Sequence, residues 1–148
     1  MHLHFTQLTG LERRLLDNFY REHGSRMRAA SDGALWVARH NGLIAGLSLS
    51  PVAGGYWLTG LFVAPEQRNR GVAAGLLDAA LAQTDGPTWL FCHPDLTPFY
   101  QRLGFEHAAH LPEALAARLA RYQRSKRLEA LVRVQSSLAS SPGNSTSV

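Results

Sequence analysis

Residues 58–77, LTGLFVAPEQRNRGVAAGLL, decide the fold class of this chain. An apolar, β-prone run over residues 56–63 enters this stretch and stops at Ala64 and Pro65. A polar turn over residues 66–70 follows, and from Gly71 onward apolar side chains recur at helical spacing. The sequence therefore predicts a strand, a tight loop and a helix start. The expected apolar face of the helix consists of Val72, Leu76 and Ala80, flanked by Ala73, Leu77 and Leu81.

The loop and the helix start have the composition of an anion-binding site. The first backbone N–H groups of a helix lack partners inside the helix, and the helix dipole adds partial positive charge there. Gly71 and Ala73 carry no bulk that would keep an anion from the backbone, and Arg68 and Arg70 add full charges. The pattern indicates a phosphate site. On the alternative interpretation the two arginines merely solvate a turn.

The motif differs from the commoner phosphate loops, because the stretch contains neither Gly-Lys-Ser/Thr nor Gly-x-Gly-x-x-Gly. It resembles the acetyl-CoA loop of the GNAT N-acetyltransferases, Gln/Arg-x-x-Gly-x-Gly/Ala, whose defined places are filled by Arg68, Gly71 and Ala73. A second stretch, PFYQRLGF at residues 98–105, resembles the Tyr-x-x-Leu-Gly-Phe segment of the same family. The resemblance runs from about residue 3 to about residue 134.

This resemblance implies acetyl-CoA as co-substrate. The pyrophosphate would meet the loop and the first turn of the helix, and the pantetheine arm would lie along the end of the preceding strand. Gly60 either marks a bulge that opens this strand or serves as a simple packing glycine. The implied cofactor-binding residues are Leu61, Phe62, Val63, Arg68, Asn69, Arg70, Gly71, Val72, Ala73 and Ala74.

Two residues are candidates for proton transfer. Tyr100 matches the general-acid tyrosine of the family, and a phenol can donate a proton to a departing thiolate; otherwise it is a core tyrosine beside Phe99. His93 has the chemistry of a general base, but it could instead hydrogen-bond the cofactor or the backbone. Asp95 could cap the next helix. The strand that carries a glutamate base in many relatives reads Tyr-Trp-Leu-Thr at residues 56–59.

Composition limits the class of protein. A chain of 148 residues with 45% hydrophobic and 18% charged residues predicts one globular domain, and no apolar run has the length of a membrane span. The single Cys92 fits a reducing compartment, so we expect a cytoplasmic protein. Its apolar neighbours predict an inert core thiol. None of the seven histidines lies in a zinc-site pattern, so no metal is expected.

The net charge of +4 fits a polyanionic ligand such as CoA. The basic residues of 118–127 raise nucleic acid as an alternative, but they lack interleaved aromatic platforms beyond Tyr122, so we expect no nucleic-acid partner.

The order of predicted elements suits a mixed α/β sheet of the GNAT type: about seven mostly antiparallel strands, flanked by helices, with splayed central parallel strands. The prediction is one acetyltransferase domain over residues 1–134 and a disordered tail over 135–148. The first helix should start at a capping box, Thr9 with Glu12, and bury Leu11, Leu15 and Phe19. Strands are expected at residues 2–8, 35–39, 43–50, 56–63, 89–92, 105–110 and 127–134.

Two regions depart from the usual family pattern. A loop over residues 25–33 replaces a second helix, and a helix over 112–124 is inserted before the last strand, with Arg118 and Arg121 opposite its apolar face. Both regions bear on the acceptor. Possible pocket residues are Phe19, Tyr20, Arg26, Arg28, Tyr56 and Trp57.

The predicted activity is transfer of an acetyl group from acetyl-CoA to a primary amine of a small molecule or peptide, by direct attack in a ternary complex. The alternatives are an O-acetyltransferase, an enzyme that uses a longer acyl chain, and a non-catalytic acyl-CoA-binding or sensor module. Either a monomer or a homodimer is expected. The sequence does not identify the acceptor or the general base.

Overall fold

The computed structural model describes residues 2–135. Three short 3₁₀ turns, labelled η, accompany the strands and helices. The elements are β1 His4–Leu8, η1 Gly10–Glu12, α1 Arg13–Glu22, β2 Ala34–Arg39, β3 Leu43–Val52, β4 Gly55–Val63, η2 Pro65–Gln67, α2 Val72–Leu81, β5 Gly86–Cys92, η3 Pro94–Leu96, α3 Thr97–Arg102, β6 Glu106–His107, α4 Glu113–Tyr122 and β7 Glu129–Gln135.

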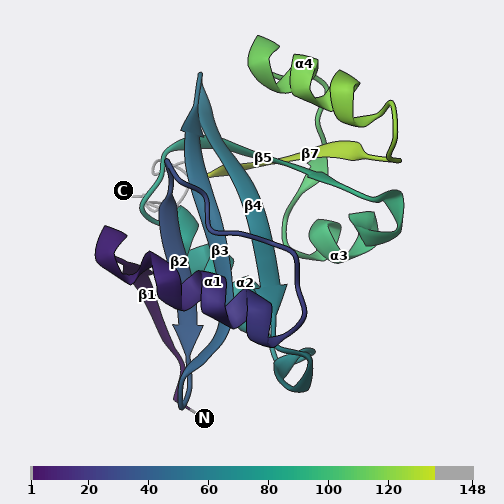
Figure 1. Ribbon diagram of the computed structural model, residues 1–148. Coiled ribbons are helices and arrows are strands. Elements are labelled where there is room, and N and C mark those ends of the chain that lie inside the picture. Colours follow the sequence, from purple (N-terminus) through teal and green to yellow (C-terminus); the bar gives the residue numbers. More distant parts are fainter. Residues whose placement is uncertain (1, 136–148) are drawn as a thin grey trace, which may run out of the picture. The chain divides into compact units, whose positions relative to one another are not determined.

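The strands form a seven-stranded sheet in the order β1-β2-β3-β4-β5-β7-β6 (Figure 1). β1 pairs antiparallel with β2, β2 with β3, and β7 with both β5 and β6. β4 and β5 are parallel, and their ladder joins two pairs, Tyr56 with Thr88 and Trp57 with Trp89. The predicted mixed, mostly antiparallel α/β fold is thus confirmed.

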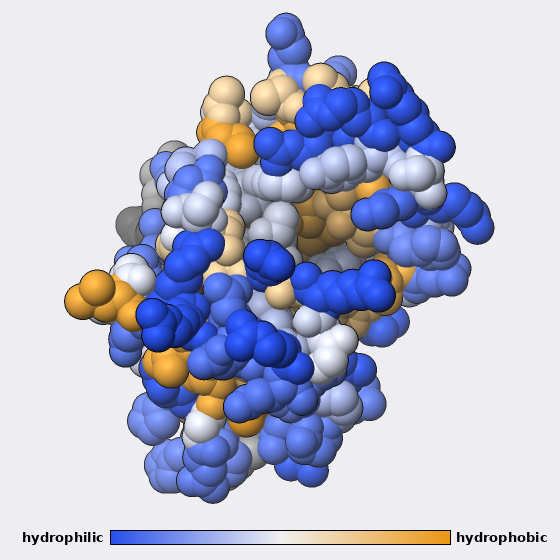
Figure 2. All heavy atoms as spheres, in the orientation of Figure 1, coloured by the Kyte–Doolittle hydropathy of each residue, from blue (hydrophilic) through white to orange (hydrophobic). Residues whose placement is uncertain are grey.

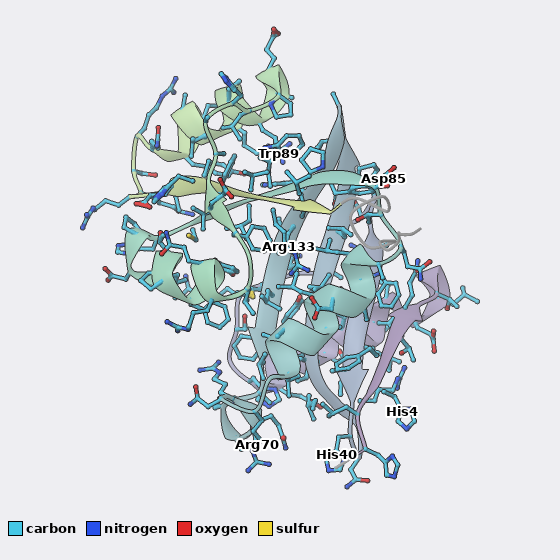
Figure 3. The ribbon with its side chains drawn as sticks, turned by 180° about the vertical axis from the view of Figure 1, so that it is seen from behind. His4, His40, Arg70, Asp85, Trp89 and Arg133 are labelled. Atoms are coloured by element: carbon cyan, nitrogen blue, oxygen red, sulfur yellow. The ribbon has the colours of Figure 1, made fainter. Side chains whose placement is uncertain are left out.

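The described chain divides into two compact units. The first contains residues up to 51 together with 58–83, and the second contains residues 52–57 and those from 84 onward. In the first unit, α1 and α2 cover opposite faces of the strands, as the front and rear views show (Figures 1 and 3). α1 packs so closely on β3 that a Cβ atom added to Gly46 would lie 2.4 Å from Cδ1 of Leu16.

The predicted apolar face of α2 is confirmed, because Val72, Leu76, Leu77, Ala80 and Leu81 are all buried. The predicted face of α1 is wrong in part: Leu11 is 96% exposed and Leu15 is 41% exposed, whereas Leu16, Phe19 and Tyr20 are buried. The reason is that η1 precedes α1, so Leu11 lies outside the helix and the apolar stripe begins one residue later than expected. The predicted capping box is present, because the backbone N–H of Thr9 donates to Glu12 Oε1 over 2.9 Å. It caps the 3₁₀ turn η1, however, and not α1.

The second unit contains β5, β6, β7, α3 and α4. β7 lies between β5 and β6, so Leu131 is fully buried while Val134 is 69% exposed. The alternating residues Leu128, Ala130, Val132 and Val134 therefore do not form a buried face. β6 spans two residues instead of six, and it is the last strand of the sheet.

Several bounds also differ from the predicted ones. β3 runs through Pro51, so the break before β4 shrinks to the turn at Ala53 and Gly54. β5 begins at Gly86 because that residue already pairs with Gln135 of β7. Gln135 belongs to β7, and the rest of the predicted tail, residues 136–148, lies outside the described residues. Within residues 2–135, none of the helices combines the length and apolar character needed to cross a bilayer.

Candidate active site

The loop before α2 has the backbone geometry of an anion-binding turn. Asn69 and Gly71 have φ angles of 64° and 77°, in the left-handed region that favours glycine. Gly71 caps α2 at its N-terminus, and a Cβ atom added there would meet no protein atom within 4 Å. The free N–H groups of the first turn therefore border open space. Val72 is buried beneath this turn, while Ala73 and Ala74 are partly exposed.

The two arginines of the loop do different things. Arg68 Nε donates to the carbonyl oxygen of Val63 over 2.8 Å, and its guanidinium lies 5.2 Å from the centre of the Phe62 ring. This ties the loop to the end of β4. Arg70 is exposed and its side chain extends away from the ribbon (Figure 3). Arg68 thus has a structural role in addition to its charge, and Arg70 is free to follow an anion.

The end of β4, where Leu61, Phe62 and Val63 lie, packs against α1. Phe62 contacts the ring of Phe19 edge-on at 5.9 Å and the ring of Tyr20 at 6.4 Å. Phe19 and Tyr20 are 2% and 0% exposed, so both belong to the core and not to a pocket surface, contrary to the sequence-based suggestion. Their burial fixes the strand that precedes the loop.

Gly60 interrupts the regular geometry of β4. Its φ of 69° is that of a glycine at a bulge. The hydroxyl of Tyr20 donates to its carbonyl oxygen over 2.5 Å, and a Cβ atom at Gly60 would lie 2.6 Å from that hydroxyl oxygen. Burial raises the pKa of Tyr20, which keeps this donor protonated. No local sequence pattern predicts the contact between these two residues, which are forty positions apart.

We predict that Tyr20→Phe destabilises the protein without unfolding it. The variant keeps the buried ring but leaves the Gly60 carbonyl without its donor, which costs roughly 1–3 kcal/mol of the free energy of unfolding. Urea unfolding of both proteins measures the difference. The exposed Tyr122, 40% accessible, provides the control, because Tyr122→Phe should change the free energy by less than about 0.5 kcal/mol. Equal effects of the two substitutions would contradict the assignment.

Tyr100 lies on α3 in an apolar setting. Its ring contacts Phe99 at 5.0 Å and Phe105 at 5.9 Å, both edge-on. Burial, with a smaller contribution from the nearby Cys92, raises the pKa of Tyr100 to about 12. The phenol therefore stays protonated at neutral pH, which is the state that a general acid needs before it donates.

His93 is placed as a cap. Its Nδ1 accepts a hydrogen bond from the backbone N–H of Asp95 over 3.0 Å at the start of η3. Asp95, the residue that we expected to cap, has Oδ2 3.5 Å from the same Nδ1. A neutral ring that accepts at Nδ1 carries its proton on Nε2. His93 would have to give up this cap to accept a proton as a base.

A polar chain that sequence reasoning missed anchors α3. Thr97 Oγ1 donates to Glu129 Oε1 over 2.9 Å, and His107 Nε2 lies 2.8 Å from the same oxygen. The hydrogen bond with His107 and, to a smaller extent, the hydrogen bond with Thr97 lower the pKa of Glu129. Burial raises the pKa of the Cys92 thiol, whose sulfur is 3.8 Å from Thr97 Oγ1; the predicted core thiol is therefore observed. These contacts join β5, β6 and β7 to α3, the helix that carries Tyr100.

A family model described as the acetyltransferase (GNAT) domain matches residues 31–107, which is more than half of the chain. The chain belongs to the GNAT acetyltransferase family. The match covers both motifs, from the loop at Gly71 to the segment at Tyr100. A search of curated proteins found no matching sequence.

Solved GNAT-type structures share the fold at low sequence identity. N-acetylglutamate synthase from Neisseria gonorrhoeae, complexed with coenzyme A and N-acetyl-glutamate, is 18% identical with a TM-score of 0.63 over 90% of this chain, which spans 35% of that protein. A GNAT acetyltransferase from Staphylococcus aureus is 16% identical with a TM-score of 0.61, covering 90% of this chain and 99% of that one. The ribosomal-protein-S18-alanine N-acetyltransferase from Escherichia coli is 12% identical with a TM-score of 0.66, covering 91% and 95%.

The candidate residues of this GNAT domain fall into two groups. The residues predicted to bind the cofactor, from Leu61 to Ala74, lie in the first unit, where Arg68 joins the loop to Phe62 and Val63. Tyr100 and His93 lie in the second unit, with Cys92 beside Tyr100. Among residues 2–135 no group of three or more His, Cys, Asp or Glu side chains is arranged to hold a metal ion.

Proposed function

We propose that this chain transfers the acetyl group of acetyl-CoA to a primary amine. The observation that carries the proposal is the turn at Gly71, with its left-handed backbone, its open space and its place at the start of α2. Membership in the GNAT family supports the same cofactor. Coenzyme A is present in the N-acetylglutamate synthase structure, and we extend it to this chain as part of the proposal.

The loop holds the cofactor by its pyrophosphate in this proposal. The backbone N–H groups of residues 69–74 donate to the phosphate oxygens. Arg70 adds charge from an exposed side chain that forms neither a hydrogen bond nor an ion pair within residues 2–135. Arg68 uses Nε on Val63, which leaves its two terminal nitrogens for the anion. The pantetheine arm takes its hydrogen bonds from the backbone of Leu61, Phe62 and Val63.

The chemical step is direct attack of the amine on the thioester. The nitrogen lone pair forms the C–N bond, the C–S bond breaks, and Tyr100 gives its phenolic proton to the leaving sulfur. The nitrogen releases one proton to His93 or to solvent water, which balances the proton gained by the thiol. A phenolate with a pKa near 12 recovers its proton readily at neutral pH. His93 is the weaker member of the proposal, because acting as base would disrupt its cap.

Thermal unfolding with acetyl-CoA tests the cofactor site. At about one hundred times its dissociation constant, acetyl-CoA should stabilise the wild type by about 2.7 kcal/mol. We expect Gly71→Glu to abolish this stabilisation, because the carboxylate occupies and repels the phosphate position. Gly24→Glu is a matched control: Gly24 has a φ of 69°, and nothing lies within 4 Å of an added Cβ atom there.

Both glutamates impose the same left-handed strain, of about 1–2 kcal/mol, so a difference in the acetyl-CoA response reports the site alone. A folded wild type without any shift would refute the acetyl-CoA proposal. A shift retained in Gly71→Glu would place the cofactor elsewhere. Release of CoA with a panel of amines, alcohols and acyl-CoA lengths then separates amine transfer from ester formation, longer acyl donors and mere binding.

A further inference from the structure

The inserted helix α4 places an arginine over a tryptophan of β4. The Cζ atom of Arg118 lies 4.2 Å from the centre of the Trp57 ring, close enough for a cation–π contact. Trp57 in turn packs edge-on against Phe91 of β5 at 5.8 Å. It is also the last residue of the short ladder that joins β4 to β5. All three residues belong to the second unit. The sequence analysis placed Arg118 opposite the apolar face of the helix and did not predict this contact with Trp57.

The polar groups of this stack are unused. Within residues 2–135 the guanidinium of Arg118 forms neither an ion pair nor a hydrogen bond. The Trp57 Nε1 atom is buried without a hydrogen-bond partner. Stacking uses the flat face of a guanidinium and leaves the N–H groups at its edge free. Because partly buried polar groups are normally paired, the guanidinium edge of Arg118 has donors for an acceptor that residues 2–135 do not supply.

The surrounding charge is strongly positive. α4 has one carboxylate, Glu113, at its far end, and hydrophilic side chains cover the outside of this helix (Figure 2). The next carboxylate along the chain, Glu129, is occupied by Thr97 and His107. The basic residues are Arg118, Arg121, Arg124, Lys126 and Arg127. Arg118 differs from the others because it is partly buried, whereas the other four are exposed.

We propose that Arg118, held over the ring of Trp57, binds a carboxylate of the acceptor. The acceptor class is then an amine that also carries a carboxylate, as amino acids and the ends of peptides do; this inference rests on the proposed function. A planar guanidinium edge matches a planar carboxylate with two parallel hydrogen bonds. A plain cationic amine would gain nothing from this stack and would be repelled by the charge around it.

Product-like ligands test the site without turnover. The probes are the N-acetyl derivatives of the L-amino acids and of their amides, titrated calorimetrically into the CoA-saturated protein. We expect at least one acid to bind the wild type about tenfold to a hundredfold more tightly than its amide, the range of a charge-assisted hydrogen bond. Arg118→Met keeps an apolar stem over Trp57 and should lose this preference. Arg121→Met, on the same helix, should keep it.

Arg118→Lys keeps the charge without the planar edge and should retain a reduced preference, which controls for misfolding of the methionine variant. No acid preference in the wild type, or one that survives Arg118→Met, overturns the proposal. Tighter binding of O-phosphoethanolamine than of any acid would also overturn it in favour of phosphate. Salt-sensitive binding of an oligonucleotide that competes with the acids would likewise overturn the proposal, in favour of nucleic acid.

Turnover separates this inference from the proposed function. Acid preference in binding, without CoA release from any amine, would sink the transfer proposal and leave the carboxylate site standing. If CoA is released equally fast with amino acids and with their amides as acceptors, the transfer proposal stands and the carboxylate site is refuted.

Discussion

Tyr100→Phe should lower kcat for acetyl transfer by about 10²–10⁴-fold, the usual contribution of a positioned general acid. The substitution removes one oxygen from a ring that packs edge-on against Phe99 and Phe105, so the apolar contacts remain. Acetyl-CoA affinity should change little, because the proposed proton transfer stabilises the transition state in which the C–S bond breaks and not the bound ground state. Stopped-flow or steady-state release of CoA measures kcat, and calorimetry measures the dissociation constant.

The control is Tyr122→Phe, which removes a hydroxyl from an exposed tyrosine of the same unit. It should leave kcat within about twofold, since loss of a hydroxyl from an exposed side chain usually has a small effect. A Tyr100→Phe enzyme with unchanged kcat would show that Tyr100 is a core residue only. Loss of acetyl-CoA affinity together with kcat would mean that the hydroxyl binds the cofactor instead of donating a proton.

The same assignment fixes the sign of one pH effect. A general acid must be protonated, and its contribution falls as pH rises through its pKa. Because burial raises the pKa of Tyr100 to about 12, its deprotonation should not lower kcat between pH 7 and about 10. Any fall on the alkaline side within that window would have to come from another group.

The features that were predicted correctly from the sequence depend on local patterns. The turn at Gly71 was predictable because a strand, a proline and a glycine at a helix start each leave a local signature. Gly104, with a φ of 95°, follows the end of α3 and obeys the same kind of local rule. These features depend on residues within one turn of each other, and so they can be read without knowing what packs against them.

The features that were predicted wrongly or not at all share a different cause. Leu15 and Leu16 are neighbours of equal hydrophobicity, and only contact with β3 decides that Leu16 is the buried one. His93 caps η3 in place of Asp95, although acidic residues are the stronger capping type. The hydrogen bond from Thr97 to Glu129 joins residues that are 32 positions apart, and no periodicity in the sequence predicts it. Long-range pairing, which sets much of the candidate site, has no local signature.

Leu76→Ala should cause the largest loss of stability among the changes considered, about 2–5 kcal/mol, as for other buried leucines. Leu76 is 0% exposed on α2, where the lost methyl groups leave a cavity beneath the helix that Gly71 caps. Urea unfolding measures the change in the free energy of unfolding. Leu11→Ala is the matched control, because Leu11 is 96% exposed and its truncation should cost less than about 0.5 kcal/mol.

The response of this variant to acetyl-CoA then tests how the cofactor site is built. If the site consists of backbone N–H groups at the start of α2, Leu76 contributes packing but no contact, and acetyl-CoA at about one hundred times its dissociation constant should still add about 2.7 kcal/mol. The liganded variant would regain much of the stability that the free wild type has. A variant that is folded but no longer stabilised would show that the first turn of α2 depends on the core beneath it, and that the cavity disorders the N–H groups which hold the phosphates.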